Sequence, residues 1–230
     1  MSDINLVIFD CDGTLMDTEL IAAAAETELL AEYGIEISLK EFTNRFAGTS
    51  SSYVFKTLED EYGRSFPDDH LEKLKLKMHE KLWREAKSID GAHEMLDVLD
   101  YPRCICSNAG TEKLKIELSR AKLWDRFRPY VYSATDLDGC NIKPAPDIFL
   151  HAAQDFEVDA STCVVVEDSK SGVAGGLAAG MRVIGFAGGS HTYPSHADDL
   201  IDAGAETVVR RLADIPATIE AFKLWDGLNG

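Results

Sequence analysis

The chain has 230 residues, of which 45% are hydrophobic and 27% are charged, as in an ordinary globular protein with its own core. Its 23 Lys and Arg against 40 Asp and Glu give a net charge of −17 at pH 7. Such a surface repels phosphate backbones and anionic lipid headgroups, which argues against nucleic acid or a membrane as a partner. No run approaches the roughly 20 apolar residues of a membrane span, and Met1–Phe9 lacks the basic region of a targeting segment.

The first predicted element is a short buried strand at Leu6–Phe9. Between Thr18 and about Ser88 the pattern is helical, and a small polar loop is predicted at Gly48–Ser52. Asp17 and Thr18 are expected to cap the first helix of this region. The expected helices cover Ile21–Tyr33 with a stop at Gly34, a segment opened by a capping box at Ser38–Glu41, and Asp69–Ala86.

Strands and helices alternate through the rest of the chain. Strands are predicted at Arg103–Ser107, Tyr130–Tyr132, Cys163–Val166, Arg182–Phe186 and Thr207–Val209. Helices are predicted at Ala92–Leu99, Thr111–Ala121, Asp147–Asp155, Gly172–Ala179 and Ile215–Phe222. Continuous apolar strands separated by helices indicate a parallel sheet covered on both faces. The fold class is therefore α/β: a Rossmann-like parallel sheet core (residues 1–15 and 89–230) with an inserted all-helical cap domain (residues 16–88).

The five cysteines do not form a disulfide framework, because their number is odd and their spacing irregular. Cys104 and Cys106 lie two residues apart in an apolar run, hence on one face of a strand. They are interpreted as buried thiols. This usage fits a reducing compartment, so a cytoplasmic protein is expected.

Polar residues follow the predicted strands at the edge where an open α/β sheet binds its ligand. They are Asp10, Asp12, Ser107, Asn108, Glu167 and Asp168, with Lys143 preceding a helix. Crowded carboxylates repel one another unless some are protonated or a hard cation lies among them. Oxygen ligands of this kind suit Mg²⁺. Lys143 and the Ser107 hydroxyl are suited to hold phosphate oxygens.

Two carboxylates at this edge suit phosphoryl transfer. One carboxylate attacking phosphorus gives an aspartyl-phosphate. The other, two residues along, can protonate the leaving oxygen and then deprotonate water. The expected partner is thus a small phosphorylated metabolite.

Four segments occur in the order and spacing of a known family: Asp10-Cys11-Asp12-Gly13-Thr14-Leu15-Met16-Asp17, Ser107-Asn108, Lys143-Pro144, and Glu167-Asp168-Ser169-Lys170-Ser171-Gly172. They resemble the four motifs of the haloacid dehalogenase superfamily. The helical insertion resembles the cap of the branch that contains phosphoglycolate phosphatases, sugar phosphatases and β-phosphoglucomutases.

The resemblance implies a role for each motif residue. Asp10 is the nucleophile and a metal ligand, and Asp12 is the general acid and base whose backbone carbonyl also binds Mg²⁺. Ser107 and Lys143 bind the transferring phosphoryl group, with Asn108 beside them. Asp168 is a direct metal ligand, and Glu167 supports the metal site.

Within this family the residues favour hydrolysis of a phosphomonoester. Dehalogenases lack the second aspartate, Asp12. β-Phosphoglucomutases carry a β-branched apolar residue where this chain has Thr14, a histidine where it has Ala22 and an arginine near Ser51. Without that arginine a second phosphate lacks a clamp, so water is the expected acceptor. Mutase-like transfer remains an alternative.

A receiver-like phosphoacceptor also remains an alternative, although receivers take their acidic pair and phosphoacceptor from different strands, whereas Asp10 and Asp12 share one.

In the cap, the hydroxyls of Ser50 and Ser51 match a sugar phosphate or sugar-acid phosphate. Ser169 is expected to cap the helix after it, and His191 is placed where it could overlook the site. A monomer or weak homodimer is expected.

Overall fold

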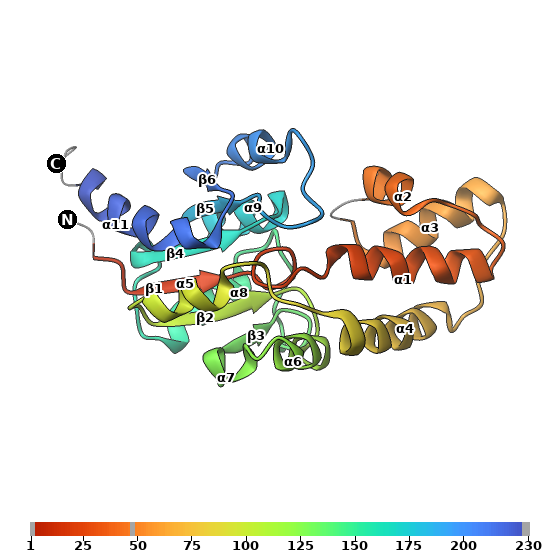
Figure 1. Ribbon diagram of the computed structural model, residues 1–230, viewed down its shortest axis with the longest axis horizontal. Helices are drawn as coiled ribbons and strands as arrows, with labels where there is room; N and C mark the ends of the chain where they lie inside the picture. The colour runs from red at the N-terminus through yellow and green to blue at the C-terminus, as the bar shows by residue number, and fades with distance from the viewer. Residues whose placement is uncertain (1–2, 47–48, 227–230) are drawn as a thin grey trace. The chain divides into compact units, whose positions relative to one another are not determined.

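The computed structural model describes residues 3–46 and 49–226, and side chains to residue 224. The chain divides into two compact units, Met1–Asp17 with Lys87–Gly230, and Thr18–Ala86 (Figure 1). The first unit holds the sheet and the second is helical. The α/β core with a helical insertion, predicted from the alternation of apolar runs and helical segments, is confirmed.

Six strands of the described chain form one parallel sheet in the order β3-β2-β1-β4-β5-β6. They are β1 Leu6–Phe9, β2 Arg103–Ser107, β3 Val131–Ser133, β4 Cys163–Glu167, β5 Arg182–Phe186 and β6 Thr207–Val209. Ile8 of β1 pairs with Cys104 on one side and Val165 on the other. The strand order reverses at β1, so the gap between the carboxyl ends of β1 and β4 is the topological switch point where such sheets bind ligands.

Helices cover both faces of this sheet, and β1 and β4 are therefore buried at every position. The helices of this unit are α5 Ala92–Val98, α6 Thr111–Arg120, α7 Trp124–Phe127, α8 Asp147–Asp155, α9 Lys170–Ala178, α10 His196–Asp202 and α11 Ile215–Asp226. Short 3₁₀ turns lie at Ala160–Thr162 and Leu212–Asp214. The sequence did not predict α7 or α10, because one is a single turn and the other is largely polar.

On one face of the sheet, alternate residues of neighbouring strands pack into a common core. Ile8, Cys106 and Val165 pack there with Phe149 of α8 and Val173 of α9. All five cysteines lie in the described part of the chain and are free thiols. Cys104 and Cys106 are fully buried in this core, which confirms their interpretation as packing residues.

The helical unit contains α1 Glu19–Glu32, α2 Leu39–Phe46, α3 Ser51–Tyr62 and α4 His70–Glu85. It has its own apolar core, built around Leu29, Phe42, Phe55 and Phe66. Gly34 follows α1 with a φ of 76°, as expected of a glycine that ends a helix. The Ser38 hydroxyl accepts a hydrogen bond from the Glu41 amide at 3.2 Å, which confirms the predicted N-terminal cap of α2.

Two local predictions were wrong, one inside the helical unit and one where the chain enters it. Ser51 and Ser52 begin α3 and are not part of a loop, since the Ser50 hydroxyl caps that helix by accepting from the Tyr53 amide at 3.3 Å. Gly48 lies outside the described residues. In the described structure Thr18 is the N-cap residue of α1 without a side-chain capping hydrogen bond. Asp17 instead accepts hydrogen bonds from the amide and hydroxyl of Ser190, at 3.0 and 2.5 Å, because the loop after β5 reaches it.

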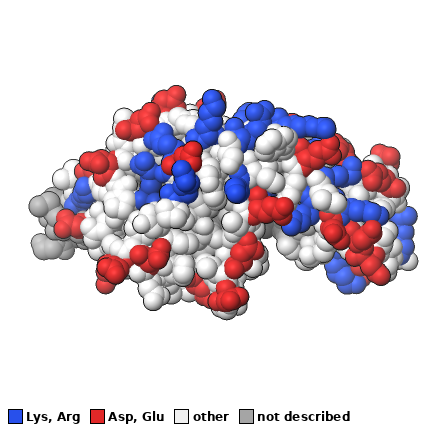
Figure 2. Space-filling model, turned by 90° about the horizontal axis from the view of Figure 1, so that it is seen from below, with Lys and Arg blue, Asp and Glu red and all other residues white. Residues whose placement is uncertain are grey.

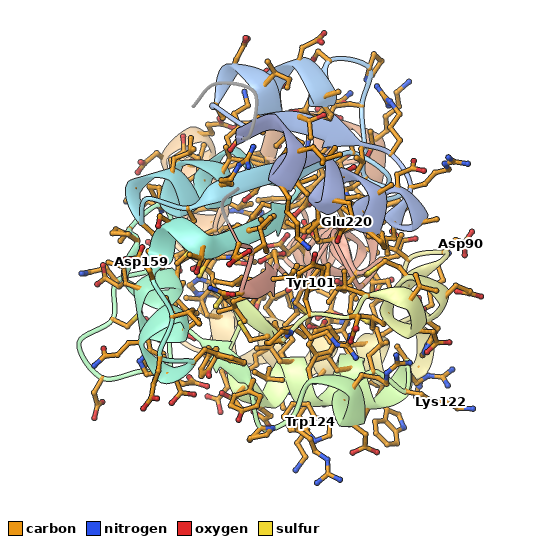
Figure 3. The ribbon with its side chains drawn as sticks, turned by 90° about the vertical axis from the view of Figure 1, so that its left-hand side faces the viewer. Asp90, Tyr101, Lys122, Trp124, Asp159 and Glu220 are labelled. Carbon is orange, nitrogen blue, oxygen red and sulfur yellow. The ribbon has the colours of Figure 1, made fainter. Side chains whose placement is uncertain are left out.

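Tyr101, which precedes β2, marks the amino end of the sheet. Its hydroxyl donates to Glu220 of α11 at 2.5 Å (Figure 3).

Lys and Arg side chains are interspersed with Asp and Glu on the face drawn in Figure 2, so the negative net charge does not describe every face. Among the described residues, no helix combines the length and the apolar composition that crossing a membrane requires.

Candidate active site

The turn after β1 brings Asp10 to the switch point of the sheet. The Asp10 amide donates to the Val166 carbonyl of β4 at 2.9 Å, which extends the strand pairing to this residue. Gly13 then adopts a φ of 78°, and a Cβ there would lie 2.1 Å from Asp168 Oδ2. Glycine is required at this position because the backbone is left-handed and the carboxylate of Asp168 occupies the space of a side chain.

Lys143 lies at the centre of the site, with its side chain only 2% exposed. Its ammonium donates to Asp10 Oδ1 at 2.5 Å, to Glu167 Oε1 at 2.7 Å and to the Cys106 carbonyl at 2.7 Å. Asn108 positions the Lys143 backbone, since its side-chain oxygen accepts from the Lys143 amide at 2.9 Å. Four segments distant in the sequence thus meet at one lysine, as the motif spacing predicted.

Burial controls the electrostatics of this cluster. It raises the pKa of Asp10 well above its usual range; Lys143 acts in the opposite direction, while Glu167 and Asp168 add to the increase. Burial alone would lower the pKa of Lys143, but the carboxylates of Asp10 and Glu167 outweigh it and raise that pKa above its ordinary value. Lys143 therefore stays charged. Its single positive charge does not balance the three carboxyl groups of Asp10, Glu167 and Asp168 when these are ionised.

Hydrogen bonds orient the two carboxylates that follow β4. Asp168 Oδ1 accepts from the Thr14 hydroxyl at 3.1 Å, and Asp168 Oδ2 lies 2.9 Å from His191 Nε2. Glu167 Oε2 accepts from the amide and hydroxyl of Ser169 at 3.0 and 2.9 Å. Ser169 also caps α9 by accepting from the Gly172 amide at 3.0 Å, which confirms its predicted role. Both carboxylates are thus held in defined orientations.

The residues present fit a divalent cation. Asp10, Glu167 and Asp168 each offer one carboxylate oxygen, and these oxygens lie within 4.8 Å of one another. All three residues are buried, and one lysine faces their combined negative charge. A hard cation with oxygen ligands balances that excess, and Mg²⁺ prefers this donor set. The side chain of Asp12 instead contacts Lys113 of α6.

The other predicted site residues have different surroundings. Ser107 is buried at the end of β2, and its hydroxyl oxygen accepts from the Ala109 amide at 3.1 Å. Ser50 and Ser51 belong to the helical unit, where Ser51 bonds to the buried Glu26. Burial raises the pKa of Glu26, and the Ser51 hydrogen bond opposes that change.

Sequence reasoning missed two residues of α6. Lys113 Nζ lies 2.5 Å from Asp12 Oδ1 and 3.7 Å from Glu117 Oε2. Burial raises the pKa of Glu117, Asp12 adds to the increase and Lys113 opposes it, and the result is a pKa of about 8. A signal was present, because Glu117 falls in the apolar stripe of the helix with Leu114 and Leu118.

The loop after β5 and the first residue of α10 supply two contacts to the site. Besides the His191 contact, His196 Nε2 donates to the Asp168 backbone carbonyl at 2.7 Å. The rings of the two histidines meet edge to face with centroids 5.4 Å apart. His191 therefore does overlook the site, whereas the role of His196 had no signal in the spacing of the histidines.

The arrangement suits nucleophilic attack by the buried Asp10 carboxylate, which faces the Lys143 ammonium beside a possible cation site. The sequence profile of the haloacid dehalogenase-like hydrolases matches residues 7–186, so the chain belongs to this family. The resemblance of the four motifs to that superfamily is thereby confirmed, and so is the hydrolase class. Membership of a hydrolase family leaves the receiver-like alternative without support.

Three relatives place the chain within the family. The 6-phosphogluconate phosphatase of Escherichia coli (strain K12) is 30% identical over 84% of this chain and 87% of its own. A haloacid dehalogenase-like protein of unknown function from Agrobacterium tumefaciens str. C58 is 48% identical, with a TM-score of 0.88 over 96% of this chain and 99% of that one. A hydrolase of the same family from Deinococcus radiodurans R1, solved with bound phosphate and sodium, is 31% identical. The two structures match with a TM-score of 0.80 over 95% of this chain and 96% of that one.

Proposed function

We propose that this protein is a Mg²⁺-dependent phosphatase that hydrolyses a small phosphomonoester through an aspartyl-phosphate on Asp10. The contact of Asp10 Oδ1 with Lys143 Nζ at 2.5 Å, beside Glu167 and Asp168 at the switch point, carries the proposal. A buried carboxylate with a neighbouring ammonium and an oxygen-rich cation site is the arrangement that attack on phosphorus requires.

The reaction takes place in two balanced steps. An Asp10 carboxylate oxygen bonds to phosphorus as the ester P–O bond breaks, and Asp12 gives its proton to the leaving oxygen. Asp12 then takes a proton from water, whose oxygen bonds to phosphorus as the acyl-phosphate P–O bond breaks. Inorganic phosphate leaves, and Asp10 is regenerated. Each step needs one proton transfer of the kind that a positioned carboxyl group performs.

Lys143 and Ser107 hold and neutralise the phosphoryl group in this proposal. All three hydrogens of the Lys143 ammonium are engaged, so a bound phosphate must replace one of its present acceptors. Asp10, Asp168 and the Asp12 carbonyl would hold Mg²⁺, with Glu167 in support. A bound Mg²⁺ supplies positive charge to the phosphoryl oxygens.

The preferred substrate is a sugar phosphate or a sugar-acid phosphate. The E. coli relative is named for a sugar-acid phosphate, and 30% identity over most of both chains supports a similar class here. The role of Ser50 and Ser51 as hydroxyl partners of such a substrate stays a prediction, because Ser50 caps α3 and Ser51 bonds to Glu26 within the helical unit. Mutase-like transfer is the competing outcome, and the alanine at position 22 and the serine at position 51 argue against it. The cytoplasmic location and the monomeric or weakly dimeric state stay predictions.

The test is phosphate release from a panel of sugar phosphates, sugar-acid phosphates, phosphoglycolate and nucleotides. Each substrate is assayed with Mg²⁺ and with excess EDTA. We expect release only with Mg²⁺, and the highest kcat/KM on a sugar-acid or sugar phosphate. A parallel assay converts glucose 1-phosphate to glucose 6-phosphate. Isomerisation without net release would replace the phosphatase by a mutase, and metal-independent release would remove Mg²⁺ from the proposal.

A further inference from the structure

Asp12 is held in a group of charges separate from the Lys143 cluster. Lys113 Nζ lies 2.5 Å from Asp12 Oδ1, and the two side chains are only 17% and 15% exposed. On its other side Lys113 faces Glu117 Oε2 at 3.7 Å, and the Glu117 side chain is fully buried. The Lys113 ammonium thus lies between two carboxylates, one from the turn after β1 and one from α6.

Packing fixes where α6 presents these residues. Lys113 and Glu117 are four residues apart and share a helix face, and the neighbouring Leu114 and Leu118 are fully buried. Glu117 Oε1 accepts from the Cys11 thiol at 3.3 Å, which links α6 to the same turn that carries Asp12. Lys113 therefore has little freedom to leave Asp12.

We propose that Lys113 is a positioning residue for Asp12, and that Glu117 holds Lys113 in place. The inference rests on the proposed phosphatase function. The Lys113 ammonium donates its hydrogen bond to Asp12 Oδ1. Lys113 keeps its own protons throughout the reaction. It acts by holding the Asp12 carboxyl group in one orientation, since a misplaced general acid loses much of its catalytic effect.

The chemistry of the leaving group tests this role. An aryl phosphate releases a stable phenolate and needs little proton donation, whereas an alkyl phosphate needs the general acid. We expect Lys113→Met to lower kcat/KM for alkyl phosphates by about 100-fold or more, in line with the usual contribution of a general acid. The loss of kcat/KM on p-nitrophenyl phosphate should be at least tenfold smaller. Because kcat/KM here reports formation of the phosphoenzyme, later hydrolysis does not obscure the difference.

Matched variants separate positioning from folding. Lys115→Met changes an exposed lysine of the same helix and should leave both rates unchanged. Lys113→Arg should restore most of the activity on alkyl phosphates. If Lys113→Met is poorly folded, the double variant Lys113→Met/Glu117→Gln also replaces the buried carboxyl group that has lost its lysine partner, and it should show the same leaving-group selectivity.

Two results would overturn the inference, and a third would have a different meaning. Equal losses on alkyl and aryl phosphates would make Lys113 a structural residue only. No loss on either class would remove it from the reaction. A wild-type protein that releases no phosphate from any substrate would instead refute the proposed function, and this inference would fall with it.

Discussion

Two lysine-centred clusters lie at opposite ends of the same sheet, and they differ in burial. At the carboxyl end, Lys143 contacts Asp10 and Glu167 with its side chain 2% exposed. At the amino end, where Figure 3 labels Tyr101 and Glu220, Lys223 lies 3.1 Å from Glu220 and 4.8 Å from the ring centre of Tyr101, with its side chain 31% exposed. The same kinds of groups have different consequences, because water screens the second cluster and is excluded from the first. Burial is what makes the first cluster suited to chemistry.

The largest expected effect comes from removing the proposed nucleophile. Asp10→Asn should lower phosphate release by about 10⁴-fold or more, because the amide cannot form the acyl-phosphate. Steady-state release with saturating substrate and Mg²⁺ measures the loss. Circular dichroism should remain unchanged, which would show that the fold is retained. Activity within tenfold of wild type would place the nucleophile elsewhere.

The next largest effect is on stability. Lys143→Met should lower the unfolding free energy by about 3–5 kcal/mol, because it leaves buried carboxylates without their ammonium partner. Urea denaturation without Mg²⁺ gives the value. Lys223→Met is the matched control at the amino end. If both substitutions lowered the unfolding free energy equally, burial would not explain the difference between the Lys143 and Lys223 clusters.

The buried Glu117 should make stability depend on pH. Its folded pKa is raised from 4.5 to about 8, so between these values the folded state binds more protons than the unfolded state. The contribution of this carboxyl group is therefore fully present below about pH 4.5 and is lost as pH rises to about 8. Urea midpoints across this window should fall less steeply for Glu117→Gln than for wild type. An unchanged slope would show that Glu117 does not titrate there.

The smallest effect is expected at the amino end of the sheet. Glu220→Gln should change the unfolding free energy by about a tenth of the Lys143→Met effect, because exposed ion pairs contribute little. Phosphate release should be unchanged, since Glu220 lies at the opposite end of the sheet from Asp10. Thermal denaturation at low and high salt would measure the change. A loss of activity would reveal a connection between the two ends.

The local order of strands and helices was readable from the sequence, because apolar runs and helical periodicity are local properties. Asp10, Lys143 and Asp168 could be placed at one edge because the carboxyl ends of parallel strands meet there. The boundaries of β2, β5, β6 and α8 agree with their predicted ranges. The cysteines of β2 were likewise correctly interpreted as core thiols.

Only the tertiary structure decided which side chains orient these groups. Lys113 meets Asp12 across 101 positions of the chain, and Ser190 reaches Asp17 across 173. No periodicity in the sequence encodes such contacts, because they depend on how α6 and the loop after β5 pack against the turn that follows β1. The sequence alone determined the candidate reacting groups, while long-range packing determined the partners that hold them.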